Sequence, residues 1–451
     1  MTAHIVRPAS LPSSHPLWRD GIDSLSLPTL TTDHSCDVAI IGGGFSGLWS
    51  AFHLLNFDPS LSIAIFESEE IGFGASGRNG GWVSADYPVD QGTLTRRYPD
   101  RDIKGFSDLL ARGVDEIGEI ASKISPRSHF RKAGSLLFAT NQIQLRRLQD
   151  SIDERHHLLS ARELEEKIAL PSAIGALFTK DCGTVNPRGL LLDLAIHLKS
   201  RGVSIFERSL ATRSARGLRV NGHPVRAAWT IEATEAFRRR SREQIPLYSL
   251  MIATRALSAA EKKSLGWTPG LAIAEATNNV NYAQLTSDAR LAVGGRGARY
   301  PFGSQLDPSL ESASKTHQEL TSMIHSWFPV LDQIEITHHW GGAIAIRRNW
   351  ESRISIDQRD GFAQLGGYVG DGMTMSFISA RAVAAEITKG EKLLASMPID
   401  STRRGRKKWP IEPLRYLGAN ALFSNIRALD RAESEGKKSR WRRKMMALIG
   451  K

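Results

Sequence analysis

Three glycines near the amino end of the 451-residue chain have the spacing of a dinucleotide-binding turn. Gly42, Gly44 and Gly47 form the pattern G-x-G-x-x-G between the apolar run 37–41, a predicted strand, and the predicted helix 48–56. In such a turn the first glycine permits the bend, the second lets the backbone approach a pyrophosphate, and the third lets helix and strand pack closely. The pyrophosphate lies at the amino end of the helix, where backbone N–H groups are free. The predicted contacts are Gly42, Gly44, Phe45, Ser46 and Gly47.

An acidic residue stands where the same motif needs one. The apolar run 63–66 predicts a second strand, and Glu67 follows it, 20 residues after Gly47. A carboxylate at this place accepts hydrogen bonds from the ribose hydroxyls of an adenosine. The order and spacing of strand, helix, second strand and acidic residue are therefore those of a nucleotide-binding βαβ unit. The motif alone does not distinguish NAD from FAD. The alternative is a glycine-rich turn without a ligand.

A second glycine-rich segment distinguishes FAD from NAD as the predicted cofactor. Residues 72–81 read GFGASGRNGG, and together with the first motif they make the sequence similar to the D-amino-acid-oxidase-like family of FAD-dependent oxidoreductases. Within that family the chain most resembles the subgroup that includes gamma-glutamylputrescine oxidase. The resemblance implies that this segment lies under the flavin and its pyrophosphate, where small residues admit a flat ring and an arginine offers a charged donor. The residues it assigns to FAD are Ser76, Arg78, Asn79, Gly80 and Gly81.

The resemblance continues along most of the chain. Residues 186–187 and the helix after them match the family's segment before the adenine-side strand, which places Ala211 beside the adenine. Residues 340–342 (WGG) and 349–350 (NW) resemble a segment that passes the flavin face. Residues 366–372 (GGYVGDG) resemble the C-terminal signature, where the amino end of a helix stabilises the negative charge of reduced flavin. The further FAD contacts that follow are Ala211, Gly342, Gly370, Asp371, Gly372 and Met373.

The substrate side of the site carries weaker signals. Trp340 and Tyr368 are the catalytic-site candidates, predicted to shape the substrate pocket, with Tyr248 and Tyr282 as weaker ones. The alternative for each is a place in the hydrophobic core. Thr374 corresponds to a lysine that holds the substrate carboxylate in the sarcosine-oxidase branch of the family. This departure argues against a simple α-amino-acid substrate and fits the polyamine-like subgroup better.

The resemblance implies an enzyme that oxidises the C–N bond of an amine or amino-acid-like substrate to an imine. FAD is the implied cofactor and oxygen the implied acceptor, giving hydrogen peroxide. The expected partner is therefore a small-molecule amine. The alternatives that stay open are a flavoprotein dehydrogenase, an RNA-modifying flavoprotein that uses the basic tail, a flavin-binding module without turnover, and an NAD-dependent dehydrogenase, for which the segment 72–81 has no explanation.

These motifs need strands and helices that alternate along the chain, as their apolar periodicity predicts. Apolar spacing predicts helices over 100–125 and 140–168, among others. We expect an α/β fold, with a doubly wound FAD-binding domain (Rossmann-like, of the glutathione-reductase type) interlaced with a mixed-sheet substrate domain. The predicted segments are 30–90, 170–240 and 345–395 for the FAD-binding domain, 91–169 and 241–344 for the substrate domain, and 396–451 for a basic C-terminal tail.

The net charge of +12 is concentrated in one segment. Residues 401–451 hold 15 Lys and Arg against 4 Asp and Glu, so the rest of the chain is almost neutral. A solvated charged end is the plain interpretation, and a peripheral membrane surface or an acidic partner is the alternative. Nucleic acid is not expected, because the body of the protein lacks a basic surface. Residues 409–423 are apolar enough to pack on the body.

Composition excludes several other classes of protein. The 2 cysteines exclude a disulfide scaffold. The uncharged stretch 38–57 holds four glycines and several polar residues, so it is not a membrane span. Adjacent histidines at 156–157 and 338–339 lack the spacing of a helical metal site, so no metal is expected. We expect a cytoplasmic protein.

Overall fold

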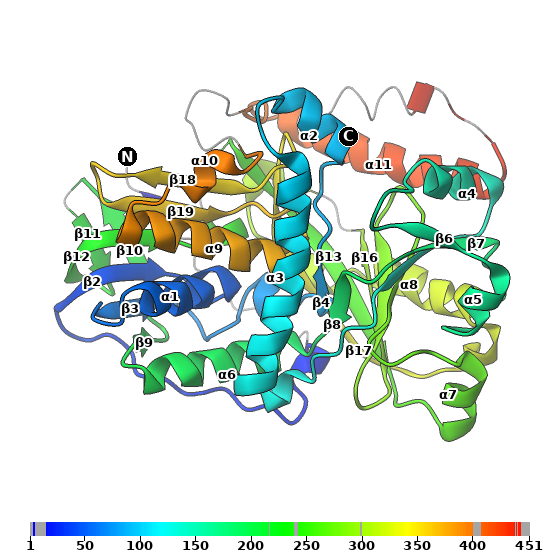
Figure 1. The fold of residues 1–451 in the computed structure, drawn as a ribbon, viewed down its shortest axis with the longest axis horizontal. Helices are drawn as coiled ribbons and strands as arrows, with labels where there is room; N and C mark the ends of the chain where they lie inside the picture. Colours follow the sequence, from blue (N-terminus) through cyan, green and yellow to red (C-terminus); the bar gives the residue numbers. More distant parts are fainter. Residues whose placement is uncertain are drawn as a thin grey trace.

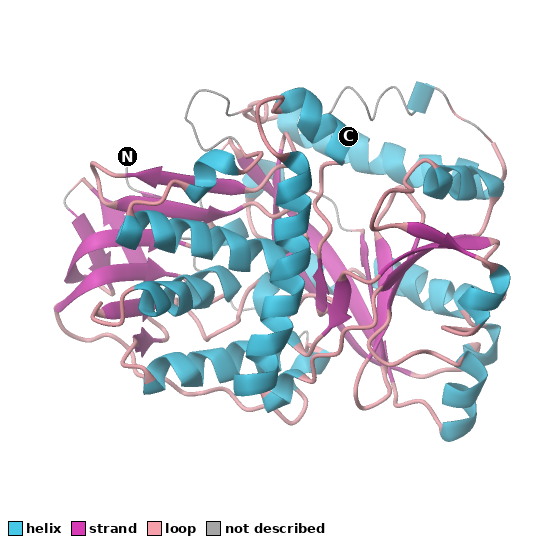
Figure 2. Cartoon of the chain, in the orientation of Figure 1, coloured by secondary structure: helices cyan, strands magenta, loops and turns pink. Residues whose placement is uncertain are grey.

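Two large β-sheets lie side by side, and helix α3 (Ile103–Ile124) runs in front of the junction between them (Figure 1). The computed structural model describes residues 3–4, 15–215, 217–238, 242–297, 300–399, 407–437, 439 and 441–442. Helices accompany the strands in both halves (Figure 2). The α/β architecture predicted from the sequence is confirmed.

The first sheet carries the glycine turn. Its central strands are parallel and occur in the order β12 (His223–Glu232), β2 (His34–Ile41), β3 (Ile63–Phe66) and β9 (Ser204–Phe206). β19 (Phe362–Gly366) pairs in parallel with the end of β12. Strands of this kind are buried on both faces, and β3 is buried throughout. The antiparallel strands that extend the sheet are β1 (Ala3–His4), β10 (Ala211–Ser214), β11 (Gly217–Val220) and β18 (Arg353–Asp357).

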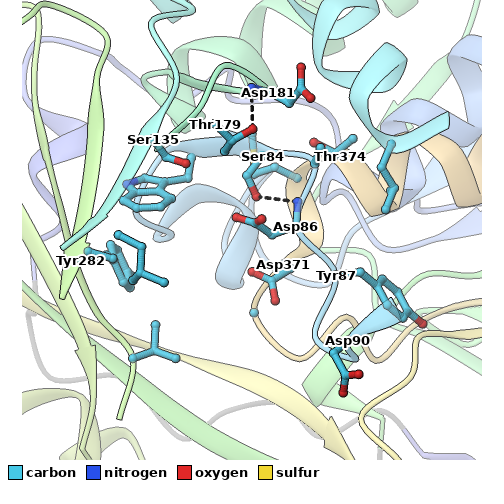
Figure 3. Close-up of a pocket in the computed structure, with 18 of the residues that line it drawn as sticks. Ser84, Asp86, Tyr87, Asp90, Ser135, Thr179, Asp181, Tyr282, Asp371 and Thr374 are labelled. Carbon is cyan, nitrogen blue, oxygen red and sulfur yellow. Dashed lines mark hydrogen bonds between the residues drawn. The ribbon is translucent and has the colours of Figure 1, made fainter. Parts of the chain in front are cut away.

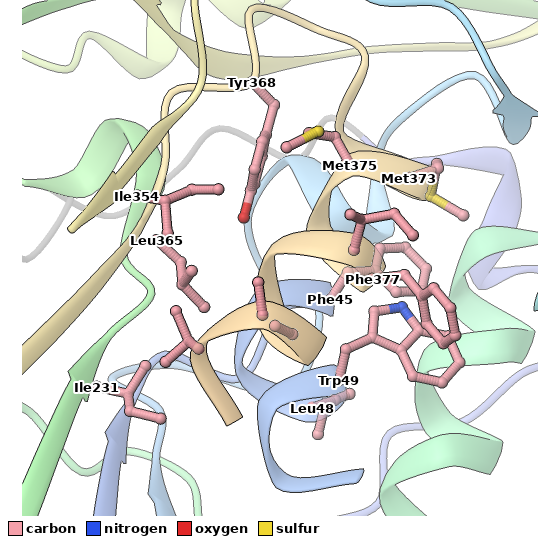
Figure 4. Packing of buried hydrophobic residues seen from close by; sticks show 14 of the residues in the cluster. Phe45, Leu48, Trp49, Ile231, Ile354, Leu365, Tyr368, Met373, Met375 and Phe377 are labelled. Carbon is pink, nitrogen blue, oxygen red and sulfur yellow. The ribbon is translucent and has the colours of Figure 1, made fainter. Parts of the chain in front are cut away.

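Helix α1 (Phe45–Phe57) begins at the glycine turn and packs along α9 (Gly372–Lys389) in the core of this half (Figure 4). The rings of Trp49 and Phe377 meet edge to face, with 5.0 Å between their centroids. α1 carries no formal charge and most of its side chains are buried, so the uncharged stretch 38–57 consists of the end of β2, the glycine turn and a core helix. α6 (Pro187–Ser200) and α3 pack beside this pair. Among the described helices, none is long and apolar enough to cross a membrane.

The second sheet is built on two long antiparallel strands, β13 (Gln244–Thr254) and β17 (Ile336–Arg347). The other strands continue from β13 in the order β16 (Leu291–Arg296), β15 (Asn281–Leu285), β14 (Ala272–Glu275), β5 (Ser135–Ala139), β7 (Gly175–Thr179) and β6 (His157–Leu159). A short ribbon of β4 (Trp82–Ser84) and β8 (Cys182–Thr184) lies between the two sheets (Figure 1). Further helices are α2 (Gln91–Arg97), α4 (Gln142–Gln149), α5 (Ala161–Glu165), α7 (Ala259–Leu265), α8 (Ser314–Trp327), α10 (Leu393–Ser396) and the 3-10 helices η1 (Leu17–Arg19) and η2 (Ala75–Gly77).

The single helix predicted over 140–168 is wrong. α4 ends before a turn at 150–156, and β6 and α5 follow that turn. A polar side chain breaks the helix because it hydrogen-bonds the backbone locally. Asp153 Oδ1 accepts the N–H groups of Arg155 and His156, each at 2.8 Å.

The division into two domains stays a prediction. β7 lies in the second sheet, although it falls in segment 170–240, which the sequence assigns to the first domain. Helix α3, from segment 91–169, packs on α6 and α9 of the first half. The chain therefore crosses between the two sheets more often than the predicted boundaries imply.

The segment 409–423 packs on the body in part, because Trp409, Ala419 and Leu422 are buried whereas Ile411, Leu414 and Leu417 are exposed. Trp409 is buried, and its indole N–H donates to the Ile346 carbonyl at 3.1 Å. Helix α11 (Leu414–Ser434) follows, and the Arg147–Glu433 ion pair, at 2.6 Å, holds its far end. Of the basic runs 403–408 and 437–444, residues 407, 408, 437, 439, 441 and 442 are described, and the others lie outside the described residues. The partners considered for this tail stay predictions.

Candidate cofactor and substrate site

The glycine turn joins β2 to α1 through backbone contacts that leave no room for a side chain. Gly42 has φ +109°, and a Cβ built on it would lie 2.6 Å from the Ala233 carbonyl oxygen. A Cβ on Gly47 would lie 2.0 Å from the carbonyl oxygen of Gly42 itself. Gly44 is the N-cap of α1 and has no side chain with which to cap it. The turn therefore presents the amino end of α1, which is the geometry that an anion-binding motif requires.

Glu67 lies at the end of β3, against this turn. Its two carboxylate oxygens accept the N–H groups of Gly43 at 2.7 Å and of Glu69 at 2.9 Å. Burial raises the pKa of the carboxyl, and these donors oppose the rise. The Ser209 N–H donates to the Glu67 carbonyl at 2.8 Å. The chain that leads into the strand beginning at Ala211 therefore lies beside Glu67. The Ala211 side chain itself is buried in the core.

The second glycine-rich segment docks directly on the first. Ser76 in η2 accepts the N–H of Phe45 at 3.0 Å, so its hydroxyl supplies the cap that α1 lacks. A Cβ on Gly44 would lie 2.7 Å from that hydroxyl. The Ser46 hydroxyl, in the first turn of α1, bonds the Tyr368 hydroxyl at 2.8 Å. Three segments that are distant in sequence thus meet at the amino end of α1.

The guanidinium of Arg78 is paired with an acidic side chain. Nη1 lies 2.7 Å from Glu311 Oε2 and donates to the Gly341 carbonyl at 3.0 Å. Nε donates to the Phe73 carbonyl at 2.9 Å, and both side chains of the ion pair are nearly buried. A contact of Arg78 with FAD stays a prediction, but the charge of this arginine is already balanced by Glu311. The Arg78 carbonyl accepts the indole N–H of Trp340 at 2.8 Å.

The two glycines after Asn79 make room for the second sheet. A Cβ on Gly80 would lie 2.2 Å from the ring of Tyr282, and one on Gly81, at φ +68°, would lie 2.2 Å from Gln284 Nε2. Gln284 donates in turn to the Gly80 carbonyl at 2.6 Å. The Asn79 side chain closes the loop by accepting the Gly81 N–H at 2.8 Å. These two glycines admit side chains of β15, and their predicted contact with FAD stays a prediction.

A tryptophan from the amino-terminal segment covers the same loop. The indole N–H of Trp18, in η1, donates to the Asn79 carbonyl at 2.8 Å. Its ring meets Trp340 edge to face, with 6.2 Å between centroids. Nothing in the local sequence around Trp18 predicts this contact.

The C-terminal signature is held by a carboxylate that the sequence analysis did not single out. Glu235, in the turn after β12, has φ +42° and accepts the N–H groups of Gly367 at 2.6 Å and Ala345 at 3.3 Å. Burial raises the pKa of this carboxyl to about 7, against the opposing effect of its N–H donors. The signal available in the sequence was an acidic residue at the end of a buried strand.

We expect Glu235 to make the protein less stable as the pH rises from 4.5 to about 7. In this interval the native carboxyl keeps its proton whereas the unfolded chain loses it, so unfolding releases a proton and higher pH favours it. The difference amounts to about 3 kcal/mol. The free energy of unfolding, from urea titrations across this pH range, should fall more steeply for the wild type than for Glu235→Gln. The slope is the readout, because the amide also changes the hydrogen bonds, and parallel curves would contradict the prediction.

A cavity of about 800 Å³ opens between the two sheets at the amino end of α9 (Figure 3). Its wall includes Gly370, at φ +110°, and Asp371, the N-cap of α9, whose side chain makes no cap hydrogen bond. The residues predicted for FAD that line it are Arg78, Asn79, Gly80, Gly342, Gly370, Asp371 and Met373. The glycine turn, Glu67, Ser76, Gly81, Ala211 and Gly372 are not part of this wall.

The four aromatic candidates differ in where they lie relative to this cavity. Tyr282 lines the cavity, whereas Trp340 and Tyr368 do not. Both are buried behind the wall, where their polar atoms already have the partners described above. Tyr248 also lies outside the cavity, and its hydroxyl accepts the Asp307 N–H at 2.7 Å.

The wall of the cavity is acidic. Its charged residues are Asp86, Asp90, Asp150, Asp153, Asp181, Asp371, Arg78 and Arg155. Arg78 is paired with Glu311, and Arg155 forms ion pairs with Asp108 and Asp181. Carboxylates therefore balance both arginines, and the wall as a whole is negative. Apart from Asp371, these aspartates share no sequence motif, because they come from three separate segments: the β4–α2 connection, the turn after α4 and the β7–β8 turn.

His15, Asp20 and His338 come together at the surface. The Asp20 carboxylate lies 3.2 Å from a ring nitrogen of each histidine. The ligand atoms that they offer lie within 4.8 Å of one another, and no other such group of three occurs in the described part of the chain. The absence of a resident metal stays a prediction.

Comparison with known protein families and relatives agrees with the motifs. The model of the family described as DAO, FAD dependent oxidoreductase, matches residues 37–386. Gamma-glutamylputrescine oxidoreductase of Escherichia coli (strain K12) is 26% identical over 384 residues, which cover 80% of this chain and 86% of the relative. A probable oxidoreductase, OrdL, of Haemophilus influenzae is 25% identical over 394 residues, which cover 82% of this chain and 86% of the relative.

Solved structures share the two-sheet architecture. Glycine oxidase from Geobacillus kaustophilus has a TM-score of 0.65 at 19% identity, covering 82% of this chain and 99% of that one. L-Amino acid deaminase from Proteus myxofaciens has a TM-score of 0.65 at 16% identity, covering 86% of this chain and 95% of that one. At identities this low, the likeness bears on the fold.

Proposed function

The chain belongs to the DAO family of FAD-dependent oxidoreductases, and from this premise we propose that it oxidises the C–N bond of an amine or amino-acid-like substrate. The product is an imine, which water hydrolyses to a carbonyl compound. Oxygen takes up the electron pair and two protons, so that amine, oxygen and water give carbonyl compound, ammonia or a smaller amine, and hydrogen peroxide. Relatives named for gamma-glutamylputrescine, glycine and L-amino acids support this substrate class.

FAD is the cofactor, and the observed geometry fits it. The amino end of α1 suits a pyrophosphate, the Glu67 carboxylate suits ribose hydroxyls, and the amino end of α9, without a side-chain cap, suits an anionic ring. When bound, FAD supplies the two-electron acceptor of the reaction. The residues that we propose to hold it are Gly42, Gly44, Phe45, Ser46, Gly47, Glu67, Ser76, Arg78, Asn79, Gly80, Gly81, Ala211, Gly342, Gly370, Asp371, Gly372 and Met373.

The observation that carries the proposal is the negatively charged cavity at the amino end of α9. Partial matches to L-2-hydroxyglutarate dehydrogenase of Escherichia coli raise a second candidate, the oxidation of a hydroxy acid. A hydroxy acid brings a carboxylate, which needs an available cation. Both arginines of the wall have carboxylate partners, so the charge of the cavity favours an amine.

Apolar side chains prepare the amine for oxidation. Phe106, Leu110, Met251 and Tyr282 line the cavity among its polar groups. An apolar surrounding disfavours the charged form of an amine and lowers its pKa. The nitrogen next to the oxidised carbon must be uncharged, because its lone pair becomes part of the C=N bond. The wall therefore supplies position and desolvation rather than a proton-transfer triad.

Anaerobic mixing of the FAD-loaded protein with a panel of primary and secondary amines tests the proposal. We expect at least one amine to bleach the flavin absorption bands, the bands to return in air, and hydrogen peroxide to form in step with the amine consumed. A matched panel of 2-hydroxy acids is the control and should leave the bands unchanged. Bands that return only with an artificial electron acceptor would replace the oxygen step by a dehydrogenase. Bands that no amine bleaches would contradict the proposal.

A further inference from the structure

Asp86 is a carboxylate in the cavity wall that the proposed reaction does not use. It follows β4 in the connection to α2, and its side chain lies in the middle of the cavity (Figure 3). The residue is exposed and lines the cavity, and desolvation by the surrounding protein raises the pKa of the carboxyl. In the described part of the chain, no lysine or arginine forms an ion pair with it.

The charged groups that face Asp86 do not neutralise it. They are His156, which favours the ionised carboxylate, and Asp181, which opposes it. Asp181 already has cations of its own, with Arg155 at 2.5 Å and Lys132 at 4.0 Å. A carboxylate in a cavity wall without a matching cation is available to a cation that a ligand brings.

The other carboxylates of the wall have structural roles or lie elsewhere. Asp90 caps α2 by accepting the Thr93 N–H at 2.8 Å, and Asp153 holds the turn that follows α4. Asp150 is the C-cap of α4. Asp371 is the N-cap of α9, at the end of the cavity that the predicted FAD contacts form. Asp86 is therefore the wall carboxylate best placed to meet a charged group of a substrate.

An unsatisfied hydroxyl independently points to a ligand in the same cavity. Thr374, in the first turn of α9, is 2% exposed and lines the wall. Its Oγ1 has no hydrogen-bond partner among the described residues. Figure 3 shows Thr374, Asp86 and Asp371 around one space. Buried hydroxyls are normally paired, so a polar ligand atom in this space would satisfy Thr374.

We propose that Asp86 binds a second, cationic nitrogen of the substrate, so that the substrate is a diamine or polyamine rather than a monoamine. This inference rests on the proposed function. One nitrogen is uncharged at the end of the cavity where the predicted FAD contacts lie, while the other stays protonated and donates charge-assisted hydrogen bonds to the Asp86 carboxylate. Asp86 is then a specificity-determining residue that takes no part in the electron transfer.

Pairs of amines that differ only in the second nitrogen test this role in the FAD-loaded protein. We compare diaminobutane with butylamine and diaminohexane with hexylamine, and measure the anaerobic rate of flavin reduction per unit of substrate concentration. The wild type should react about 100-fold faster with the diamine. Asp86→Asn should lower the diamine rate about 100-fold and leave the monoamine rate within about twofold, since only the charge pair is lost. Asp86→Glu should keep part of the preference, and Asp332→Asn, an exposed aspartate outside the cavity, should change neither rate.

The outcomes separate this inference from the proposal on which it rests. Equal wild-type rates for diamine and monoamine would overturn the role of Asp86 while C–N oxidation stands. Absence of flavin reduction by any amine would overturn the proposed function itself. An equal loss for both amines in a folded, FAD-loaded Asp86→Asn protein would show a structural role and also overturn the inference. The wild-type ratio needs no variant, so it decides the matter even if the substituted protein does not fold.

Discussion

Replacing Gly47 by alanine is expected to give a protein that purifies without FAD and unfolds at a lower urea concentration. The added Cβ would lie 2.0 Å from the carbonyl oxygen of Gly42, which is backbone and cannot rotate away. Gly42 is itself fixed, with φ +109° and the Ala233 carbonyl 2.6 Å from its own Cβ position. Relief requires α1 to move away from the turn, and this removes the amino end of the helix from the pyrophosphate site. We expect a loss of about 3 kcal/mol, at the upper end for overpacking.

The ratio of FAD to protein after purification, together with a urea titration of the free energy of unfolding, checks this prediction. Gly418→Ala is the matched control. Gly418 lies in α11, and a Cβ there would meet nothing within 4 Å. That substitution should keep FAD and raise stability by up to about 1 kcal/mol, because alanine favours a helix over glycine. A Gly47→Ala protein with full FAD content would show that the turn is not the pyrophosphate site.

Arg78→Met is expected to lower the free energy of unfolding by about 3–5 kcal/mol and to weaken FAD binding. The substitution leaves the Glu311 carboxylate nearly buried without its partner at 2.7 Å. It also removes the donors to the Phe73 and Gly341 carbonyls. The bond to Gly341 connects the loop at 72–81 to β17, so the loop loses one of its attachments to the second sheet.

A double variant separates the ion pair from the position of the loop. Arg78→Met combined with Glu311→Gln should recover part of the stability, because no charge is left buried alone. Arg162→Met removes an exposed ion pair to Glu166 and should cost no more than about 0.5 kcal/mol. Urea titrations of the three proteins against the wild type give the comparison. If Arg78→Met were as mild as Arg162→Met, the Arg78–Glu311 pair would not anchor the loop.

The predictable part of the site consists of residues that are near one another in sequence or lie on one strand–helix–strand unit. The alternation of apolar runs predicted β2, α1 and β3. Because β2 and β3 are parallel, their carboxyl ends lie at the same edge of the sheet, which places Glu67 beside the glycine turn. The Gly43–Glu67 hydrogen bond at 2.7 Å is the direct result. Apolar spacing did not predict the turn at 150–156. The Asp153 carboxylate accepts backbone N–H groups of this turn, and these bonds favour a turn over the helix that the apolar spacing indicated.

The unpredictable part depends on partners that are far apart in the chain. Arg78 meets Glu311 across 233 residues, and no local pattern encodes which arginine a carboxylate will face. Glu235 reaches Gly367 across 132 residues in the same way. Trp340 and Tyr368 were expected to shape the pocket, and they lie within the matched segments 340–342 and 366–372. Periodicity indicates that such residues are buried, but it does not indicate which of them face a cavity and which lie behind its wall.

Tyr282, on β15, contacts both the cavity and the glycine-rich loop at 72–81, and this double role limits how the protein can change over evolutionary time. Its ring lines the cavity and also fills the space that a Cβ on Gly80 would occupy. Its strand neighbour Gln284 bonds the Gly80 carbonyl. A lineage that adapts to a new substrate by changing β15 therefore disturbs the cofactor loop in the same mutational step. Adaptation on this wall therefore requires compensating changes in the cofactor loop.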